Sequence, residues 1–214
     1  MLLAIDTSVG TSVAVVDHER GILAEHSSAD TRGHAEVIGR LIRACLDDSG
    51  IAVVALSGVV AGMGPGPFTG LRVGIAAARA FAFGAGKPVV PVVSHDAIAF
   101  GVVEPLVVAT DARRSEVYWS SYSGVDAAGL PVRTSGPSLA KAVELPALVA
   151  GLGGPIAPRL IQARAVSAAA LGLLAESLYA NGRQFAASFD GRVEPLYLRS
   201  PDVTISAGPK RVTG

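Results

Sequence analysis

The chain has 214 residues, of which 50% are hydrophobic and 17% are charged, with 18 basic residues against 18 acidic ones. This length suits one large domain or two small ones, and the apolar content is enough for a full core. A protein that holds nucleic acid unaided usually carries a basic excess, so the balanced charge leaves only an indirect role in RNA chemistry.

The single cysteine, Cys45, cannot form an internal disulfide, and it lies among apolar residues at helical spacing, which predicts a buried thiol. A lone cysteine fits a reducing compartment, so we expect a cytoplasmic protein. The N-terminal apolar run has no basic segment before it and meets Asp6, which indicates a strand and not a signal peptide. Arg79 interrupts the best candidate for a membrane span, so none is expected.

The first half alternates between short apolar runs and segments with a helical period. Runs bounded by turn residues predict strands, and apolar residues recurring every three or four positions predict helices. Gly50 and Gly86 are expected to end the two helices. The expected elements are strands at 2–6, 11–16 and 22–26, a helix at 34–48, a strand from residue 59, a helix at 68–85 and a strand at 89–93.

The second half begins again in the same way. The segment from Leu106 to Asp111 echoes residues 2–6, because each is an apolar strand that ends in Asp and a turn. A half-buried strand at 117–122 and helices at 139–149 and 167–180 are expected after it. The repeated order predicts two similar α/β lobes, each with a mixed sheet. The expected units are 1–101, 102–199 and a loose tail at 200–214.

The loop before the second helix alternates Gly and Pro, which holds one stiff turn. Pro67 is expected at the first helical position, where its missing N–H is no loss. Gly70 and Gly74 follow one helical turn apart. Because Gly inside a helix costs about 1 kcal/mol relative to Ala, we expect another backbone to approach closely there.

This segment resembles the Gly-Pro-Gly-Ser-Phe-Thr-Gly-Leu-Arg signature of the TsaB (YeaZ) family, bacterial proteins of tRNA threonylcarbamoyladenosine synthesis. The matching residues are Gly64, Pro65, Gly66, Phe68, Thr69, Gly70, Leu71 and Arg72, with Pro67 where the family usually has Ser. Residues 3–8, 111–118 and 195–199 match further family segments in the same order. The resemblance implies the actin-like or sugar-kinase-like ATPase fold, built from two ribonuclease H-like lobes.

In that fold, the turn after the first strand of each lobe flanks the nucleotide phosphates. The resemblance therefore implies a vestigial nucleotide cleft at Asp6, Thr7, Ser8, Asp111 and Arg113. Each Asp could instead cap its own turn through backbone hydrogen bonds. Neither turn has the Gly that a phosphate loop needs, so we favour the capping interpretation. No tightly bound cofactor is expected, and ATP or ADP is expected only in an assembled complex.

The catalytic paralogue in the resemblance, TsaD, binds its metal through two His one helical turn apart, on the segment after the strand equivalent to 89–93. Such a pair presents both imidazoles on one helix face. Here His95 stands alone, with Ala99 four residues later, so no protein-bound metal is expected. No catalytic residue is expected either, since no Gly-x-Ser-x-Gly elbow is present.

The helices that begin at residues 34 and 68 carry apolar residues on more than one face, although a helix that packs on a sheet needs only one apolar face. Deep burial in the core would explain this width, and so would a partner protein. The resemblance implies that this pair of helices packs against TsaD as a helical bundle. We therefore expect Gly74→Leu to weaken association with TsaD more than it disturbs the fold. The expected interface residues are Val37, Ile38, Leu41, Ile42, Cys45, Gly70, Leu71, Gly74 and Ala78.

The resemblance implies a non-catalytic subunit that binds TsaD and supports its transfer of a threonylcarbamoyl group to adenosine 37 of tRNA. It further implies that the ATPase TsaE joins the complex and that this chain acts on tRNA only indirectly, through the complex. One alternative is an active ATP-dependent transferase or small-molecule kinase of the same fold. Another is a self-associating protein, a homodimer through the same helices when the partner is missing.

Overall fold

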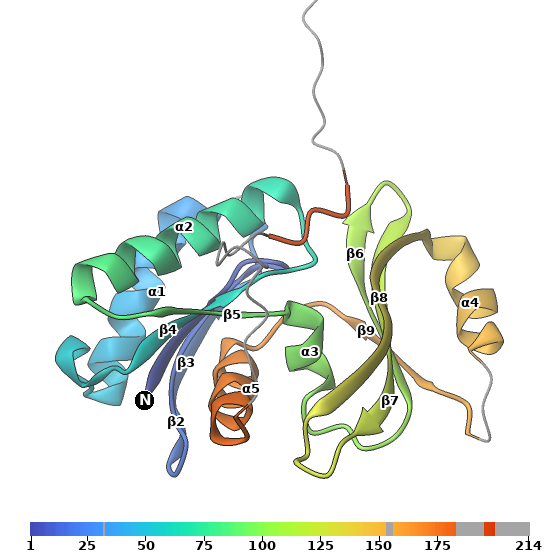
Figure 1. The fold of residues 1–214 in the computed structure, drawn as a ribbon. Coiled ribbons are helices and arrows are strands. Elements are labelled where there is room, and N and C mark those ends of the chain that lie inside the picture. The colour runs from blue at the N-terminus through green and yellow to red at the C-terminus, as the bar shows by residue number, and fades with distance from the viewer. Residues whose placement is uncertain (32, 153–155, 183–194, 200–214) are drawn as a thin grey trace, which may run out of the picture.

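The structure is a computed structural model that describes residues 1–31, 33–152, 156–182 and 195–199. Two sheets lie side by side, each covered by helices (Figure 1). Among the described helices, none has the length and apolar character needed to cross a bilayer.

The first sheet contains five strands in the order β3–β2–β1–β4–β5. Its central strand β1 is antiparallel to β2 and parallel to β4, so the sheet is mixed. Both faces are buried, because alternate side chains of β1 enter two different apolar clusters. The strands are β1 (Leu2–Asp6), β2 (Thr11–Asp17), β3 (Gly21–Ser28), β4 (Gly58–Gly62) and β5 (Val89–Val92).

Two long helices, α1 (His34–Ser49) and α2 (Phe68–Ala85), cover one face of this sheet and share its apolar cluster. Each ends where the sequence predicts, at a Gly whose φ of 65° or 63° lies in the left-handed region. The short 3₁₀ turn Val53–Ala55 joins α1 to β4. Pro67 is the N-cap of α2 and not its first helical residue, one position earlier than the sequence predicts.

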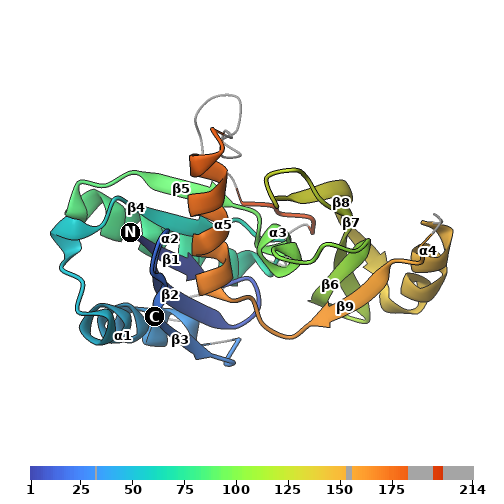
Figure 2. The same cartoon turned by 90° about the horizontal axis from the view of Figure 1, so that it is seen from below.

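The opposite face of the first sheet is covered by α5 (Ala168–Ala180), which Figure 2 shows crossing it. Glu25 in β3 anchors the start of this helix, accepting hydrogen bonds from Ser167 Oγ at 2.8 Å and Ala169 N–H at 3.1 Å. The sequence put these residues within the range of the second lobe. Their contacts join the first sheet, because α5 is apolar enough to fill the core beside β1 and β2.

The second sheet contains four strands in the order β8–β7–β6–β9. Its central strand β6 is antiparallel to β7 and parallel to β9, as β1 is to β2 and β4. This shared topology confirms the expected pair of α/β lobes with mixed sheets. The strands are β6 (Leu106–Arg113), β7 (Glu116–Val125), β8 (Pro131–Lys141) and β9 (Arg159–Ala163).

The helix expected at 139–149 is wrong at its start. Residues 139–141 belong to β8, where Leu139 pairs with Tyr118 and Ala140 pairs with Val117 of β7. Residues 139–141 (Leu-Ala-Lys) favour a helix by intrinsic propensity, but backbone hydrogen bonds to β7 outweigh this preference. The helix, α4 (Leu145–Gly151), begins only after the 3₁₀ turn Ala142–Glu144.

A short helix, α3 (Ser94–Ala99), lies between the two sheets (Figure 2). Its residue Ala97 belongs to the apolar core of the first sheet, and Ala99 belongs to that of the second. This helix therefore joins the lobes, and it borders the region where the sequence places a vestigial cleft.

Candidate functional site

Asp6 ends β1 inside the molecule, with 1% of its surface exposed. Its Oδ1 accepts hydrogen bonds from Ser8 N–H at 2.8 Å and Ser8 Oγ at 2.5 Å, and its Oδ2 accepts one from Ser94 Oγ at 2.5 Å. Burial raises the pKa of this carboxyl, against the lowering effect of those hydrogen bonds. A Cβ at Gly62 would overlap Oδ2, so the neighbouring strand also presses on the group. The chain's own atoms thus surround the carboxyl that the sequence assigns to the cleft.

Asp111 is exposed and lies two residues before the end of β6, so the strand does not end at this Asp as the sequence predicts. Its Oδ1 accepts a hydrogen bond from the backbone N–H of Arg113 at 3.0 Å. Asp6 bonds to the N–H two residues ahead in the same way, so the geometry agrees with the capping interpretation at both turns. After Asp111 the backbone is left-handed at Arg113, Arg114 and Ser115, with φ of 62°, 53° and 59°.

Thr7 explains the two glycines of α2. Its Oγ1 donates a hydrogen bond to Gly70 O at 2.7 Å, and a Cβ at Gly70 would lie 2.8 Å from Thr7 O. A Cβ at Gly74 would overlap the Thr7 side chain. The close approach expected here is confirmed, and the approaching backbone is the chain's own turn between β1 and β2. On its other side Gly70 faces His34, whose Nδ1 lies 2.8 Å from Thr11 Oγ1.

The Gly-Pro loop ties β4 to α3. Gly64 has φ of 88°, and its N–H donates to Ser94 Oγ at 3.0 Å while its carbonyl accepts from Ser94 N–H at 2.8 Å. Gly66 lies against the β1–β2 turn, where a Cβ would stand 2.8 Å from Ser8 Cα. Contact with the β1–β2 turn therefore explains Gly66, whereas Gly64 is explained by its positive φ and by the Leu71 side chain, which a Cβ would meet at 2.9 Å. Thr69 is exposed on the first turn of α2.

His95 is fully buried between two hydroxyl groups of the second lobe. Its Nδ1 lies 2.8 Å from Ser120 Oγ, and its Nε2 lies 3.0 Å from Thr110 Oγ1. Burial, with a smaller effect from Arg133, lowers the pKa of this imidazole to about 3, so it is neutral. Both ring nitrogens are occupied. No group of three or more His, Cys, Asp or Glu suited to a metal ion occurs within the described residues.

Asp96 completes a run of three polar residues at the start of α3. Tyr122 Oη donates to its Oδ1 at 2.8 Å, and Arg133 Nη1 lies 3.4 Å from the same atom. Ser94 thus bonds to the first lobe, through Asp6, while His95 and Asp96 bond to the second. The neighbourhood of the expected cleft is a polar seam between the lobes, formed by Asp6, Ser94, His95 and Asp96, of which sequence analysis singled out only Asp6 and His95.

The expected partner-interface residues are mostly inside the chain. Seven of the nine are buried, while Val37 and Ile42 are half-buried. The seven buried side chains contact the chain's own first sheet and the other helix, so their assignment as partner contacts is corrected, while Val37 and Ile42 stay predicted contacts. Cys45 is buried as expected: its Sγ donates to Val13 O at 3.0 Å, and burial raises its pKa to about 11. The buried seven are Ile38, Leu41, Cys45, Gly70, Leu71, Gly74 and Ala78.

The outer face of α2 carries a different set of residues. Phe83 is 91% exposed, and Ala76 and Ala80 are exposed beside it at a spacing of one helical turn. On α1 the exposed residues include Gly39, at which a Cβ would meet open space. Sequence reasoning missed this face, although Ala76, Ala80 and Phe83 recur at helical spacing on the side away from Leu71 and could have been found on a helical wheel.

Comparison with known proteins places the chain among related sequences. A family model described as TsaD: tRNA N6-adenosine threonylcarbamoyltransferase matches residues 9–205. An uncharacterized protein of Mycobacterium tuberculosis (strain ATCC 25618 / H37Rv), Rv3421c, is 37% identical over 209 residues, covering 94% of this chain and 92% of the relative. The tRNA threonylcarbamoyladenosine biosynthesis protein TsaB of Escherichia coli (strain K12) is 34% identical over 127 residues, covering 56% of this chain and 54% of that protein.

A solved structure shares the arrangement of both lobes. YeaZ from Pseudomonas aeruginosa superposes with a TM-score of 0.71 at 27% sequence identity, over 92% of this chain and 99% of that one. The similarity to YeaZ therefore spans both sheets, whereas the sequence match to the Escherichia coli TsaB spans about half of each chain.

The packing at Gly74 gives a stability prediction that replaces the expectation from sequence. Gly74→Ala should lower the free energy of unfolding by about 1–3 kcal/mol, because the added methyl overlaps Thr7. The matched change Gly39→Ala enters open space on α1 and should raise it by up to about 1 kcal/mol through helix propensity. Urea unfolding of both variants measures the difference. Equal stability of the two variants would contradict the packing described for Gly74.

The burial of His95 gives a pH prediction. Its pKa is lowered to about 3 from 6.5, so between those values the unfolded chain binds a proton that the folded chain does not. Stability should therefore fall as the pH drops below 6.5, by up to about 1.4 kcal/mol per pH unit from this residue. His95→Gln should lose this part of the slope in urea unfolding measured from pH 6.5 to 4.

The exposed His18, in the turn after β2, provides the control. His18→Gln should keep the slope of the unchanged protein. A slope that is the same in His95→Gln as in the unchanged protein would show that His95 titrates alike in both states.

Proposed function

We propose a function from one premise: the chain belongs to the TsaD family, whose model matches most of its length, and within it to the TsaB (YeaZ) group. Its biochemical context is the synthesis of tRNA threonylcarbamoyladenosine, the process named for its TsaB relatives. Within that process we propose a non-catalytic subunit that binds the catalytic subunit TsaD and supports it.

The observation that carries the non-catalytic role is the occupancy of Asp6. Both carboxylate oxygens already accept hydrogen bonds from Ser8 or Ser94, and the group is 1% exposed. A carboxylate that organises a metal needs an oxygen that the ion can reach, and here the chain's own atoms enclose the group. Together with the doubly bonded His95, this supports a cleft that performs no chemistry alone. ATP or ADP is proposed to bind only in the assembled complex.

The outer face of α1 and α2 is the proposed docking surface for TsaD. It offers Phe83 as an exposed aromatic side chain next to Ala76 and Ala80, which would allow another helix to approach closely. This set replaces the buried residues that the sequence suggested. With 18 basic and 18 acidic residues, the chain carries no charge excess for tRNA, so tRNA is proposed to be held mainly by TsaD, with TsaE joining the same complex.

Reconstitution tests the proposed function. Purified chain, TsaD, TsaE and a source of threonylcarbamoyl adenylate should together modify unmodified tRNA, as measured by mass spectrometry of its nucleosides. Leaving out this chain should abolish the product, and this chain without TsaD should give none. Modified tRNA formed by this chain without TsaD would contradict the non-catalytic role.

A charge on the outer face of α2 tests the docking surface. Ala80→Glu should weaken binding to TsaD by at least about tenfold, because a carboxylate would be buried in an apolar contact. The matched control is Ala147→Glu, on the exposed side of α4 in the second lobe, which should bind as the unchanged chain does. Calorimetric titration with TsaD gives both affinities. Equal affinities would reject this surface, whether or not the lone chain forms a homodimer.

A further inference from the structure

We propose that residues 195–199, here called the latch, tie the start of α2 in the first lobe to the β6–β7 hairpin of the second and so fix the opening between the lobes. Figure 1 shows this segment in red, crossing from α2 to β6 above α3.

The first end of the latch is held by the first lobe. Leu196 N–H donates to Met63 O at 2.9 Å, just after β4. The Tyr197 ring packs on that of Phe68 with centroids 4.6 Å apart, and Arg72 Nε donates to Tyr197 Oη at 3.0 Å. The Arg72 guanidinium also lies 3.8 Å from the Phe68 ring centroid. Two aromatic rings and a guanidinium therefore hold the latch to the first turn of α2.

The other end is held by the second lobe through Arg199. Its Nη1 donates to Ala112 O at 3.0 Å and lies 3.3 Å from Glu116 Oε2, on the two sides of the β6–β7 turn. That carboxylate oxygen is buried and forms no hydrogen bond among the described residues. Arg199 supplies its opposite charge, and this pair is partly shielded from water because the two side chains are only 24% and 26% exposed. Release of this end is therefore unfavourable while the hairpin keeps its position.

The two ends stand on different lobes, and this gives the latch its mechanical effect. The polar residues of α3 join the lobes lower down, through Ser94 on one side and His95 and Asp96 on the other. Contacts at α3 alone would allow one lobe to rotate about them against the other. A second set of contacts, at the latch, lies away from α3 and therefore resists this rotation. Because Phe68 and Arg72 also belong to the first turn of α2, any partner that takes these side chains competes with Tyr197 and frees the lobes.

Spin labels on the two lobes test the latch. Ala35→Cys on α1 and Ala147→Cys on α4 are exposed positions, while Cys45 is buried with a raised pKa and should stay unlabelled. Pulsed electron resonance should give one narrow distance distribution in the otherwise unchanged chain. Tyr197→Ala with Arg199→Ala should broaden it or shift it by several ångströms. Unchanged distributions in the folded double variant would overturn the proposal.

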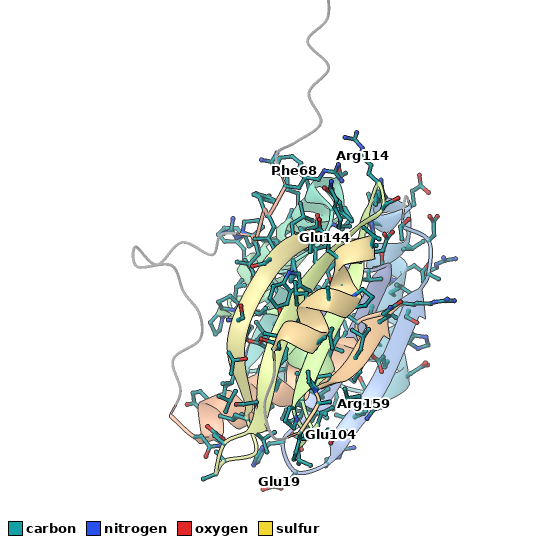
Figure 3. The ribbon with its side chains drawn as sticks, turned by 90° about the vertical axis from the view of Figure 1, so that its right-hand side faces the viewer. Glu19, Phe68, Glu104, Arg114, Glu144 and Arg159 are labelled. Atoms are coloured by element: carbon teal, nitrogen blue, oxygen red, sulfur yellow. The ribbon has the colours of Figure 1, made fainter. Side chains whose placement is uncertain are left out.

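A matched control separates release of the latch from the loss of an arginine. Arg159→Ala removes an exposed ion pair with Glu104, 3.1 Å across, at the end of the molecule away from Phe68 and Arg114 (Figure 3). It should leave the distance distribution unchanged, and broadening as large as in the latch variant would count against the proposal.

Hydrogen exchange tests the latch without any substitution that could unfold the chain. The Leu196 amide should exchange more slowly than an unstructured amide, because it donates to Met63 O. Tyr197→Phe, which removes only the hydroxyl that bonds Arg72, should speed this exchange while leaving the global unfolding transition in place. Exchange at the unstructured rate in the unchanged chain would overturn the proposal.

Discussion

The hydrogen bond from Ser94 Oγ to Asp6 Oδ2, 2.5 Å long, is the contact on which the arrangement of the two lobes depends. It fixes the start of α3 to the first sheet, and the next two residues then bond to the second sheet through Thr110, Ser120 and Tyr122. Three consecutive side chains thereby join the two lobes through polar contacts, beside Ile98, which packs against both apolar cores. Because buried polar groups are costly when unpaired, separating the lobes at this seam is unfavourable.

The same seam occupies the atoms that a reaction would need. The Asp6 carboxylate accepts three hydrogen bonds, and His95 is neutral with both nitrogens engaged. The groups that hold the lobes together therefore take the place of a catalytic constellation. This arrangement supports the proposed non-catalytic role, in which the exposed face of α2 is the proposed docking surface and the latch is the proposed restraint on the lobes.

Sequence analysis predicted the helices correctly where apolar residues recur at a clear helical spacing. The helices at 34–48 and 68–85 agree with α1 and α2 to within one residue, since apolar spacing and a Gly in the left-handed region mark their ends. It failed where pairing with a distant strand decided the structure: residues 139–141 read as helix but pair with β7, and β9 was missed because its five residues carry weak local signals. The expected tail at 200–214 lies outside the described residues.

The sequence by itself determined the family, the two mixed α/β lobes and a close approach to the second helix at Gly70 and Gly74. Only the tertiary structure decided what those glycines face. A glycine in a helix indicates that another group packs closely against it. Its position along the helix does not show whether that group is Thr7 of the same chain or part of a second protein. Burial depends on contacts between residues far apart in the chain, so the inner and outer faces of α2 became distinguishable only when the first sheet was in place.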